Sequence, residues 1–193
     1  MKDILKLGGI LLLVTAIAGA ALSMVNAITK PRIEEQKRLV TQRALTTALP
    51  KANPEAIVPV TENESVSHYI GYQTTEKQNI AGYAFVAKGA GYSSIIETMV
   101  GVDTTGTVMG IKIMQQVETP GLGTKIEEVR YGESSSWFQD QFLNRIADGL
   151  IVDKDGGDII SVTGATISCR AVANSIKKGM GELEERLGGF KVN

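Results

Sequence analysis

The chain has very little of the residues that most metal sites and nucleophile sites require. Its 193 residues include one cysteine, Cys169, and one histidine, His68. A lone cysteine excludes an internal disulfide framework and any iron–sulfur or zinc site built from several cysteines of this chain. The histidine lies in a polar stretch far from the hydroxyl-rich part of the sequence, which argues against a Ser-His-Asp or Cys-His catalytic group. We therefore expect no metal site and no triad, with Cys169 buried and His68 on the surface.

The chain also has no marked excess of positive or negative charge. Lys and Arg number 20 against 21 Asp and Glu, which leaves a net charge of −1. The sequence contains no basic patch and no nucleic-acid-binding module, so nucleic acid is not an expected partner. The length suffices for one membrane element and one domain of ordinary size.

A long uncharged run stands near the N-terminus, from Leu7 to Thr29. At roughly 1.5 Å rise per residue it can cross about 30 Å of hydrocarbon, which predicts a transmembrane helix and contact with membrane lipid. A signal peptide is the alternative, because Val25-Asn26-Ala27 resembles a cleavage site, but its apolar region would usually be only about 7–15 residues long. Small residues that let another helix approach closely are Gly8, Gly9, Gly19, Ala20 and Ala21.

The charges beside this run bear on its orientation. Lys2 and Lys6 precede it, whereas Lys30, Arg32, Lys37 and Arg38 follow it. The positive-inside rule alone would place the large C-terminal part in the cytoplasm.

A helical stalk is predicted after Pro31, from Arg32 to Leu49, with the proline in its first turn. Three further prolines, at 50, 54 and 59, end it, and the polar stretch 61–65 is where we place the domain boundary. The expected organisation is an N-terminus and transmembrane helix over 1–29, a stalk and linker over 30–65, and a globular domain over 66–193.

The globular domain begins with predicted strands. Ile80–Ala87 is one, and Ile95–Val102 and Val108–Gln116 form a hairpin around the turn 103–106. No long helix separates these strands, so the pairing is expected to be antiparallel and the fold class α+β. The glycine-rich loop 88–94 lacks the spacing of a dinucleotide-binding fingerprint.

Shorter elements are expected farther along the chain. A short helix is predicted over 125–130, and a second one after the serines at 134–136, with Trp137, Phe138, Phe142 and Ile146 in the core and Gly149 as its end. Ile151-Val152 and Ile159-Ile160 are predicted to pair as a hairpin around a Gly-Gly turn. The acidic run between them lacks the pattern of a calcium-binding loop. The tail 188–193 is expected to be frayed.

Hydroxyl side chains crowd the stretch Ser161–Ser168, just before a helical pattern. Thr163 or Thr166 could cap the helix, and its start could bind a phosphate, with Arg170 adding positive charge. Plain helix capping is the alternative. Apolar residues at helical spacing are Val172, Ile176, Met180, Leu183 and Leu187.

The loop Glu118-Thr119-Pro120-Gly121-Leu122-Gly123 follows the last predicted strand directly. Proline fixes one backbone angle and two glycines permit close approach, so the loop could press against a flat ring. An ordinary Pro-Gly turn is the alternative.

Together, these two stretches resemble the signatures of the covalent FMN-binding domain family: Glu/His-Thr-Pro-Gly-Leu-Gly, and an Asp, a spacer, then Ser/Thr-Gly-Ala-Ser/Thr, one free position and the modified Ser/Thr. The resemblance implies FMN attached through a phosphoester to Ser168, with Thr166 as the fallback acceptor. It further implies that Asp158 is recognised by a flavin transferase and that Thr119 and Leu122 contact the flavin ring. The remaining implied cofactor-binding residues are Glu118, Gly123, Thr163, Gly164 and Ala165.

With the membrane segment, the resemblance covers essentially the whole chain and is to the G subunits of Rnf electron-transport complexes. It implies an electron relay on FMN in an ion-translocating ferredoxin:NAD oxidoreductase of the inner membrane, with other Rnf subunits and the transferase as partners. It also implies that the FMN domain lies on the outer face, against the charge rule. The related C subunit of sodium-translocating NADH:quinone oxidoreductase, an unmodified membrane anchor and a stand-alone flavoprotein reductase are the alternatives.

Overall fold

A computed structural model describes residues 2–62, 64–133 and 135–190. The chain divides into two compact units, residues 1–40 and residues 41–193. Predictions for Asn63, Ser134 and the last three residues of the tail lie outside the described residues.

The first unit consists of helix α1 (Lys2–Ala48), whose last turns belong to the second unit. Side chains from Lys2 to Arg38 are exposed, and the helix is long and apolar enough to cross a membrane. Pro31 lies inside α1 and not, as predicted, at the start of a separate stalk helix. A proline there removes one backbone N–H donor, but the turns on either side keep their helical bonds.

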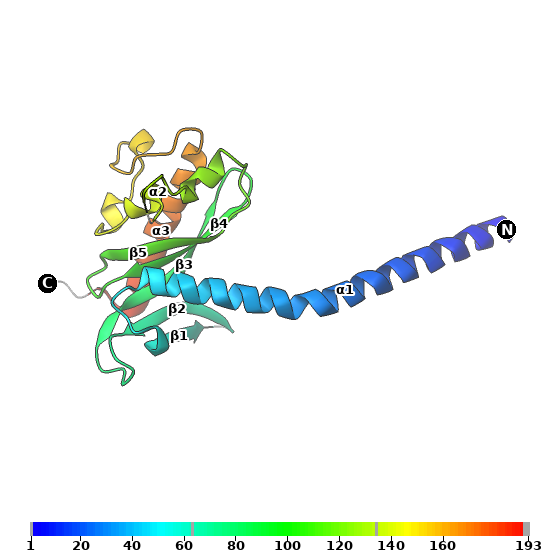
Figure 1. Ribbon diagram of the computed structural model, residues 1–193, viewed down its shortest axis with the longest axis horizontal. Coiled ribbons are helices and arrows are strands. Elements are labelled where there is room, and N and C mark those ends of the chain that lie inside the picture. Colours follow the sequence, from blue (N-terminus) through cyan, green and yellow to red (C-terminus); the bar gives the residue numbers. More distant parts are fainter. Residues whose placement is uncertain (1, 63, 134, 191–193) are drawn as a thin grey trace. The chain divides into compact units, whose positions relative to one another are not determined.

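The second unit is built on a five-stranded antiparallel sheet in the order β1-β2-β3-β4-β5 (Figure 1). The strands are β1 (Ile57–Glu62), β2 (Ser65–Tyr72), β3 (Ile80–Ala90), β4 (Ile95–Val102) and β5 (Val108–Gln115). The α+β class and the β4–β5 hairpin are confirmed.

The second unit begins at residue 41, earlier than the predicted boundary within 61–65. Part of the expected linker is strand β1, which pairs with β2 along its length. The stretch looked like a linker because it is polar, and polar residues are normal in an edge strand that is half exposed. A short 3-10 turn, Pro54–Ala56, precedes β1 and is capped by the Asn53 side chain.

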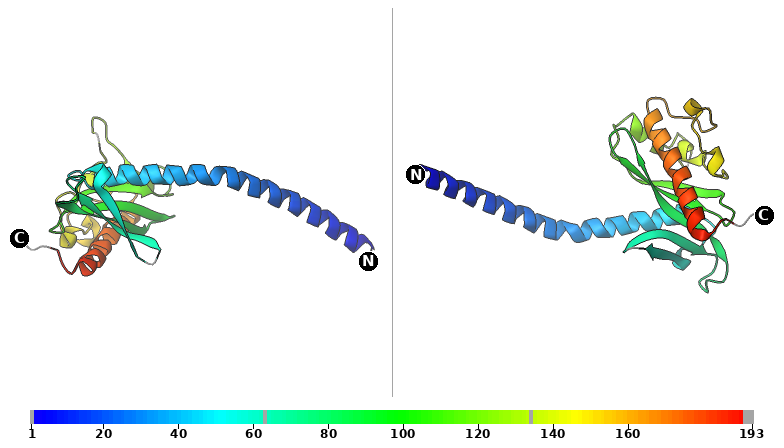
Figure 2. Two further views of the ribbon diagram at one scale, coloured as in Figure 1. Left: turned by 90° about the horizontal axis from the view of Figure 1, so that it is seen from below. Right: turned by 180° about the vertical axis from the view of Figure 1, so that it is seen from behind.

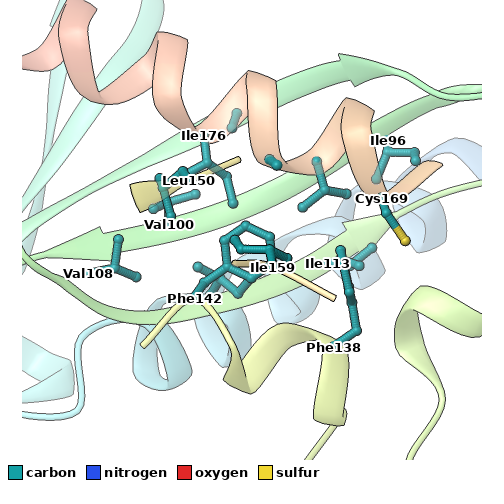
Figure 3. Close-up of a cluster of buried hydrophobic side chains, with 14 of the residues drawn as sticks. Ile96, Val100, Val108, Ile113, Phe138, Phe142, Leu150, Ile159, Cys169 and Ile176 are labelled. Carbon is teal, nitrogen blue, oxygen red and sulfur yellow. The ribbon is translucent and has the colours of Figure 1, made fainter. Parts of the chain in front are cut away.

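Helix α3 (Thr166–Leu187) covers one face of the sheet (Figure 2). Its buried residues Cys169 and Ile176 face Ile96 and Val100 of β4 in the main core (Figure 3). The predicted apolar positions of this helix are buried, apart from Leu187, which is half-buried against the same core.

The last turns of α1 pack on the opposite face of the sheet, through Ala44, Leu45 and Ala48. Two strand glycines permit this approach: a Cβ on Gly101 would lie 2.0 Å from the Ala48 carbonyl oxygen, and one on Gly110 would lie 2.4 Å from that of Thr47. The sheet is therefore covered on both faces.

Between β5 and α3 the chain is less regular than predicted. Helix α2 spans only Trp137–Asp140, and the other helical segments are 3-10 turns, Gly123–Glu127, Ala147–Gly149 and Asp153–Asp155. Phe138 and Phe142 are fully buried, as predicted, but Ile146 is exposed. Asn144, in a left-handed conformation (φ 60°), ends the turns that follow α2.

The hairpin predicted between residues 151 and 160 is wrong. Val152 and Ile159 form a single parallel bridge, because the 3-10 turn and the left-handed Gly156 carry the chain round a loop. The prediction that His68 lies on the surface is also wrong. It is buried on β2, 6 % exposed, with its ring against the edge of Tyr83. In the tail, Phe190 packs against the main core.

Candidate functional site

A pocket of about 350 Å³ lies beside the start of α3. Three segments that are distant in sequence form it: the loop before β4, the loop after β5 and the residues that open α3. Its lining residues are Tyr92, Glu118, Thr119, Leu122, Gly123, Gly164, Ala165, Thr166, Ile167 and Ser168. All the cofactor-binding residues predicted from the sequence, except Thr163, therefore gather at one pocket.

Ser168 and Glu118 are joined by a hydrogen bond across this pocket. The Ser168 hydroxyl donates to Glu118 Oε2 at 2.6 Å, although the two residues are fifty positions apart. Ser168 is 1 % exposed and Glu118 is 5 % exposed. The two sequence signatures thus meet through their most polar members.

The Glu118 carboxylate is held by the loop that precedes β4. Tyr92 N–H donates to Oε2 at 3.1 Å, and Ser93 N–H and Ser94 N–H each donate to Oε1 at 3.0 Å. The Ser94 hydroxyl donates to Oε1 at 3.1 Å. Burial by itself raises the pKa of Glu118, but the hydrogen bonds from Ser168 and from this loop outweigh it and lower the pKa to about 2. Glu118 is therefore a carboxylate at neutral pH.

Two glycines make room for this pair. A Cβ on Gly91 would lie 2.6 Å from Glu118 Oε1, and one on Gly123 would lie 2.6 Å from Oε2 and 2.8 Å from Ser168 Oγ. No side chain fits at either position without displacing the carboxylate. The glycine-rich loop 88–94 thus serves the site through close approach, a role that its sequence alone did not indicate.

The start of α3 faces the pocket without a side-chain cap. Its N-cap is Ala165, so neither Thr163 nor Thr166 caps the helix as predicted. The first bond into the helix runs from Cys169 N–H to the Ala165 carbonyl oxygen at 2.9 Å, which leaves the N–H groups of the first turn outside the helical ladder. Such a terminus favours an anion.

Arg170 does not point its charge at the pocket. Its guanidinium donates to both carboxylate oxygens of Asp155, at 2.6 and 2.7 Å. Each group shifts the other's pKa, lowering that of Asp155 and raising that of Arg170. The prediction that Arg170 adds charge beside the hydroxyl cluster is therefore wrong for this structure.

The residues before the motif are fixed by Asp153. Its Oδ1 accepts hydrogen bonds from the Ser161 N–H, at 3.0 Å, and from the Ser161 hydroxyl, at 2.6 Å. These bonds lower the pKa of Asp153 to about 2. Asp158, by contrast, has a side chain 82 % exposed and pairs with Arg145 at 3.5 Å, so it is open to recognition from outside.

Cys169 follows Ser168 but points into the core. It is fully buried, and its sulfur accepts a hydrogen bond from Val162 N–H at 3.3 Å. Burial raises the pKa of the thiol to about 11, so the thiol form prevails at neutral pH. The expectation of a small buried residue is confirmed.

Four contributors to the site were not predicted from the sequence: Tyr92, Ser93, Ser94 and Ile167. Tyr92 and Ile167 line the pocket and are 72 % and 48 % exposed. The available signal was Gly91-Tyr92-Ser93-Ser94, where a turn places consecutive N–H groups on one side. The loop does not have the spacing of a dinucleotide site, but that spacing has no bearing on whether its N–H groups bind another anion.

Comparison with protein families supports the two-part organisation. A model described as the FMN-binding domain matches residues 91–181, which contain every segment of the pocket. A second model, the RnfG N-terminal region, matches residues 1–47. The chain thus carries an FMN-binding domain behind the N-terminal helix.

Individual relatives match over nearly the whole chain. The G subunit of the ion-translocating oxidoreductase complex of Erwinia tasmaniensis is 32% identical, covering 92% of this chain and 89% of the relative. The G subunit of the Na(+)-translocating ferredoxin:NAD(+) oxidoreductase complex of Acetobacterium woodii is 31% identical, covering 91% and 89%. The corresponding G subunit of Escherichia coli K12 is 32% identical, covering 92% and 90%. With a shared N-terminal region, a shared FMN-binding domain and this coverage, the chain belongs to the family of G subunits of the Rnf ion-translocating oxidoreductase complexes.

Proposed function

We propose that this chain carries electrons on an FMN group that is attached through a phosphoester to Ser168, as one subunit of a membrane-bound ion-translocating ferredoxin:NAD oxidoreductase. The observation that carries the proposal is the position of Ser168 Oγ. It lies in the wall of the pocket where the two signatures of the FMN-binding family meet.

The residues present fit a flavin phosphate and ring. The pocket volume of about 350 Å³ is within the range of roughly 300–1,000 Å³ that is usual for small-ligand sites. Its lining combines a helix N-terminus, which suits the phosphate, with the apolar side chains of Leu122 and Ile167, which suit a flat ring. Thr119 and Leu122 are the ring contacts that we propose.

Attachment requires a hydroxyl nucleophile and a flavin dinucleotide. A bond forms between Ser168 Oγ and the phosphorus of the FMN half of FAD, the pyrophosphate bond breaks, AMP leaves and the hydroxyl proton is released. A flavin transferase is the proposed catalyst, and the exposed Asp158 is the residue that we propose it recognises. Serine in place of threonine supplies the same oxygen. Thr166, which lines the same pocket, remains the fallback acceptor.

FMN, once bound, supplies the electron chemistry, and the chain supplies orientation and electric field. Leu122 and Ile167 give the pocket an apolar lining. In the unmodified chain, Glu118 places a negative charge beside the proposed attachment point. No acid–base residue of this chain is needed for such a relay.

The proposed location is the inner membrane, with α1 as a single transmembrane helix and the FMN domain on the outer face. Length and composition of α1 support the crossing, and membership of a membrane-complex family supports the location. The proposed partners are the other membrane and iron–sulfur subunits of an Rnf complex, because the relatives are named as subunits of such complexes. A covalent tether suits a cofactor on an outer face, where free flavin would be lost.

The experiment compares the full chain with Ser168→Ala, each expressed with a flavin transferase. Intact mass and flavin fluorescence are recorded on the denatured proteins. The expected result is a fluorescent wild-type band with the added mass of FMN less one water, and no flavin on Ser168→Ala. Flavin that persists on Ser168→Ala but disappears in Thr166→Ala would move the site to Thr166. A wild type without flavin beside an active transferase would leave an unmodified membrane anchor as the better explanation.

A further inference from the structure

The Glu118 carboxylate occupies an anion site made by the protein backbone. Three consecutive N–H groups, of Tyr92, Ser93 and Ser94, converge on it at 3.0–3.1 Å, together with the Ser94 hydroxyl. Successive backbone N–H groups that point into one concavity form a nest, which binds phosphates in many proteins. In this structure the anion in the nest belongs to the chain itself.

The Ser168 hydroxyl reaches the same carboxylate. Its Oγ lies 2.6 Å from Glu118 Oε2, the oxygen that also accepts from Tyr92 N–H. Two oxygens of one phosphate group are separated by about the length of a short O–H···O hydrogen bond, roughly 2.5 Å. An oxygen of a phosphate on Ser168 Oγ can therefore stand where Glu118 Oε2 stands now.

Both anions cannot remain there together. An esterified Oγ has no hydrogen to donate, so the bond to Glu118 is lost when Ser168 is modified. The phosphodiester adds a negative charge next to a carboxylate in a site that is almost fully shielded from water, where like charges repel strongly. The N–H donors of the nest remain available to whichever anion stays.

We propose that the backbone N–H groups of Tyr92, Ser93 and Ser94 form the phosphate subsite of the attached cofactor. This inference rests on the proposed attachment of FMN to Ser168. Glu118 fills this subsite only in the unmodified chain. Esterification exchanges one anion for the other: the phosphodiester takes the N–H groups, and the carboxylate turns out of the nest.

The first test measures amide hydrogen exchange at residues 92–94 in Glu118→Ala, before and after flavin attachment. In the unmodified variant no carboxylate occupies the nest. We expect amide exchange at residues 92–94 to be about 10- to 100-fold faster than in the unmodified wild type, because these N–H groups have lost hydrogen bonds to a charged group. After attachment we expect exchange to return to the slow wild-type rate. Exchange that stays fast in the flavin-carrying variant would overturn the proposal.

Two controls distinguish faster exchange caused by an empty nest from faster exchange caused by general loosening of the loop. Glu118→Ala combined with Ser168→Ala takes up no flavin, so its exchange must stay fast after treatment with the transferase and FAD. Glu127→Ala removes a nearby carboxylate that instead accepts from the Gln116 side chain at 2.7 Å. Its exchange at residues 92–94 is expected to remain slow.

A second measurement uses the wild-type chain, so that it does not depend on how Glu118→Ala folds or loads. The Glu118 carboxyl is titrated by carbon-13 NMR with and without attached FMN. Expulsion from the nest returns its pKa from about 2 to the ordinary range, about 4. A midpoint that stays near 2 in the flavin-carrying protein would show that Glu118 keeps its donors and would refute the proposal.

If the proposed function itself were wrong, the experiments would give different results. A wild type that never acquires flavin, or a Ser168→Ala variant that acquires it, would refute attachment at Ser168 itself. Flavin on Ser168 with unchanged Glu118 titration would refute only the phosphate subsite.

Discussion

Arg170 and Asp155 form a bidentate ion pair, in which Nε and Nη2 of the arginine lie 2.6 and 2.7 Å from the two carboxylate oxygens. Arg170 lies one turn beyond the start of α3, where a positive charge could have served an incoming phosphate. Because both nitrogens are bound to Asp155, the positive charge of Arg170 is directed away from the pocket.

The first prediction follows from this pair. Arg170→Ala should leave flavin attachment at the wild-type level, because its guanidinium is directed at Asp155 and not at Ser168. The measurement is flavin fluorescence per mole of denatured protein. Loss of more than about tenfold would mean that Arg170 leaves Asp155 to bind the phosphate, and Asp155→Asn would then be expected to increase loading.

The second prediction concerns the pH dependence of stability. The folded pKa of Glu118, about 2, lies below its ordinary value of 4.5, so its ionisation stabilises the folded unmodified chain above pH 4.5. This contribution, roughly 3 kcal/mol at pH 7, is lost as the pH falls from about 5 towards 2. Denaturant unfolding of wild type and Glu118→Gln, measured between pH 7 and pH 3 in detergent, should show a steeper fall for the wild type.

Asp153 also has a lowered pKa and titrates over the same range. It is present in both proteins, so the difference between them isolates Glu118. Parallel pH profiles for the two proteins would contradict the prediction.

The third prediction uses two glycines of α3 that lie two residues apart. A Cβ on Gly179 would lie 2.3 Å from the ring of Phe85, whereas one on Gly181 would meet no atom within 4 Å. Gly179→Ala should destabilise the domain by about 1–3 kcal/mol through overpacking. Gly181→Ala should stabilise it by roughly 0.5–1 kcal/mol, since alanine favours the helix. Shifts of the same sign in the unfolding midpoints of both variants would be inconsistent with this packing.

The fourth prediction concerns the thiol of Cys169. Because the residue is fully buried and its thiol pKa is raised to about 11, a maleimide reagent at pH 7 should not label the folded chain. Labelling should become complete in denaturant. Rapid labelling of the native protein would show that the first turn of α3 opens readily.

An unreactive native thiol makes the orientation of the chain testable, and this is the fifth prediction. Glu76→Cys introduces a thiol in an exposed loop of the FMN domain, and Lys2→Cys introduces one before the apolar run. With the domain on the outer face, a membrane-impermeant maleimide should label only Glu76→Cys in intact cells. Labelling of Lys2→Cys alone would favour the orientation that the positive-inside rule indicates.

Strands β3, β4 and β5 were predicted from the sequence, whereas β1 and β2 were not. β4 and β5 have clear boundaries because a polar, glycine-containing turn separates two apolar runs. Glu118 and Ser168 could be assigned to one site because the motifs that contain them resemble two signatures of one FMN-binding family. Neither motif reveals that the serine hydroxyl donates to the glutamate, since that depends on how two distant loops pack.

The misassignments share a physical origin. His68 was expected on the surface because its neighbours are polar, yet its side chain is buried and its ring packs against Tyr83 of β3. The hairpin expected around Gly156 fails because side chains such as Asp153 tie the chain into a loop. In both cases tertiary contacts override a local pattern. The nest at Tyr92 was missed because a backbone donor leaves almost no trace in a sequence.

The consecutive strand order of the sheet bears on how the domain is made. Each strand pairs with its neighbour in the chain, so the sheet can assemble by adding one hairpin after another, with little loop-closure entropy at each step. Helix α3, which covers one face of the sheet and carries Ser168, the proposed flavin acceptor, is the last of these elements to leave the ribosome. Biosynthesis therefore completes the acceptor only after every strand of its scaffold exists, and a chain truncated before α3 would have an uncovered apolar sheet face and no place for a cofactor.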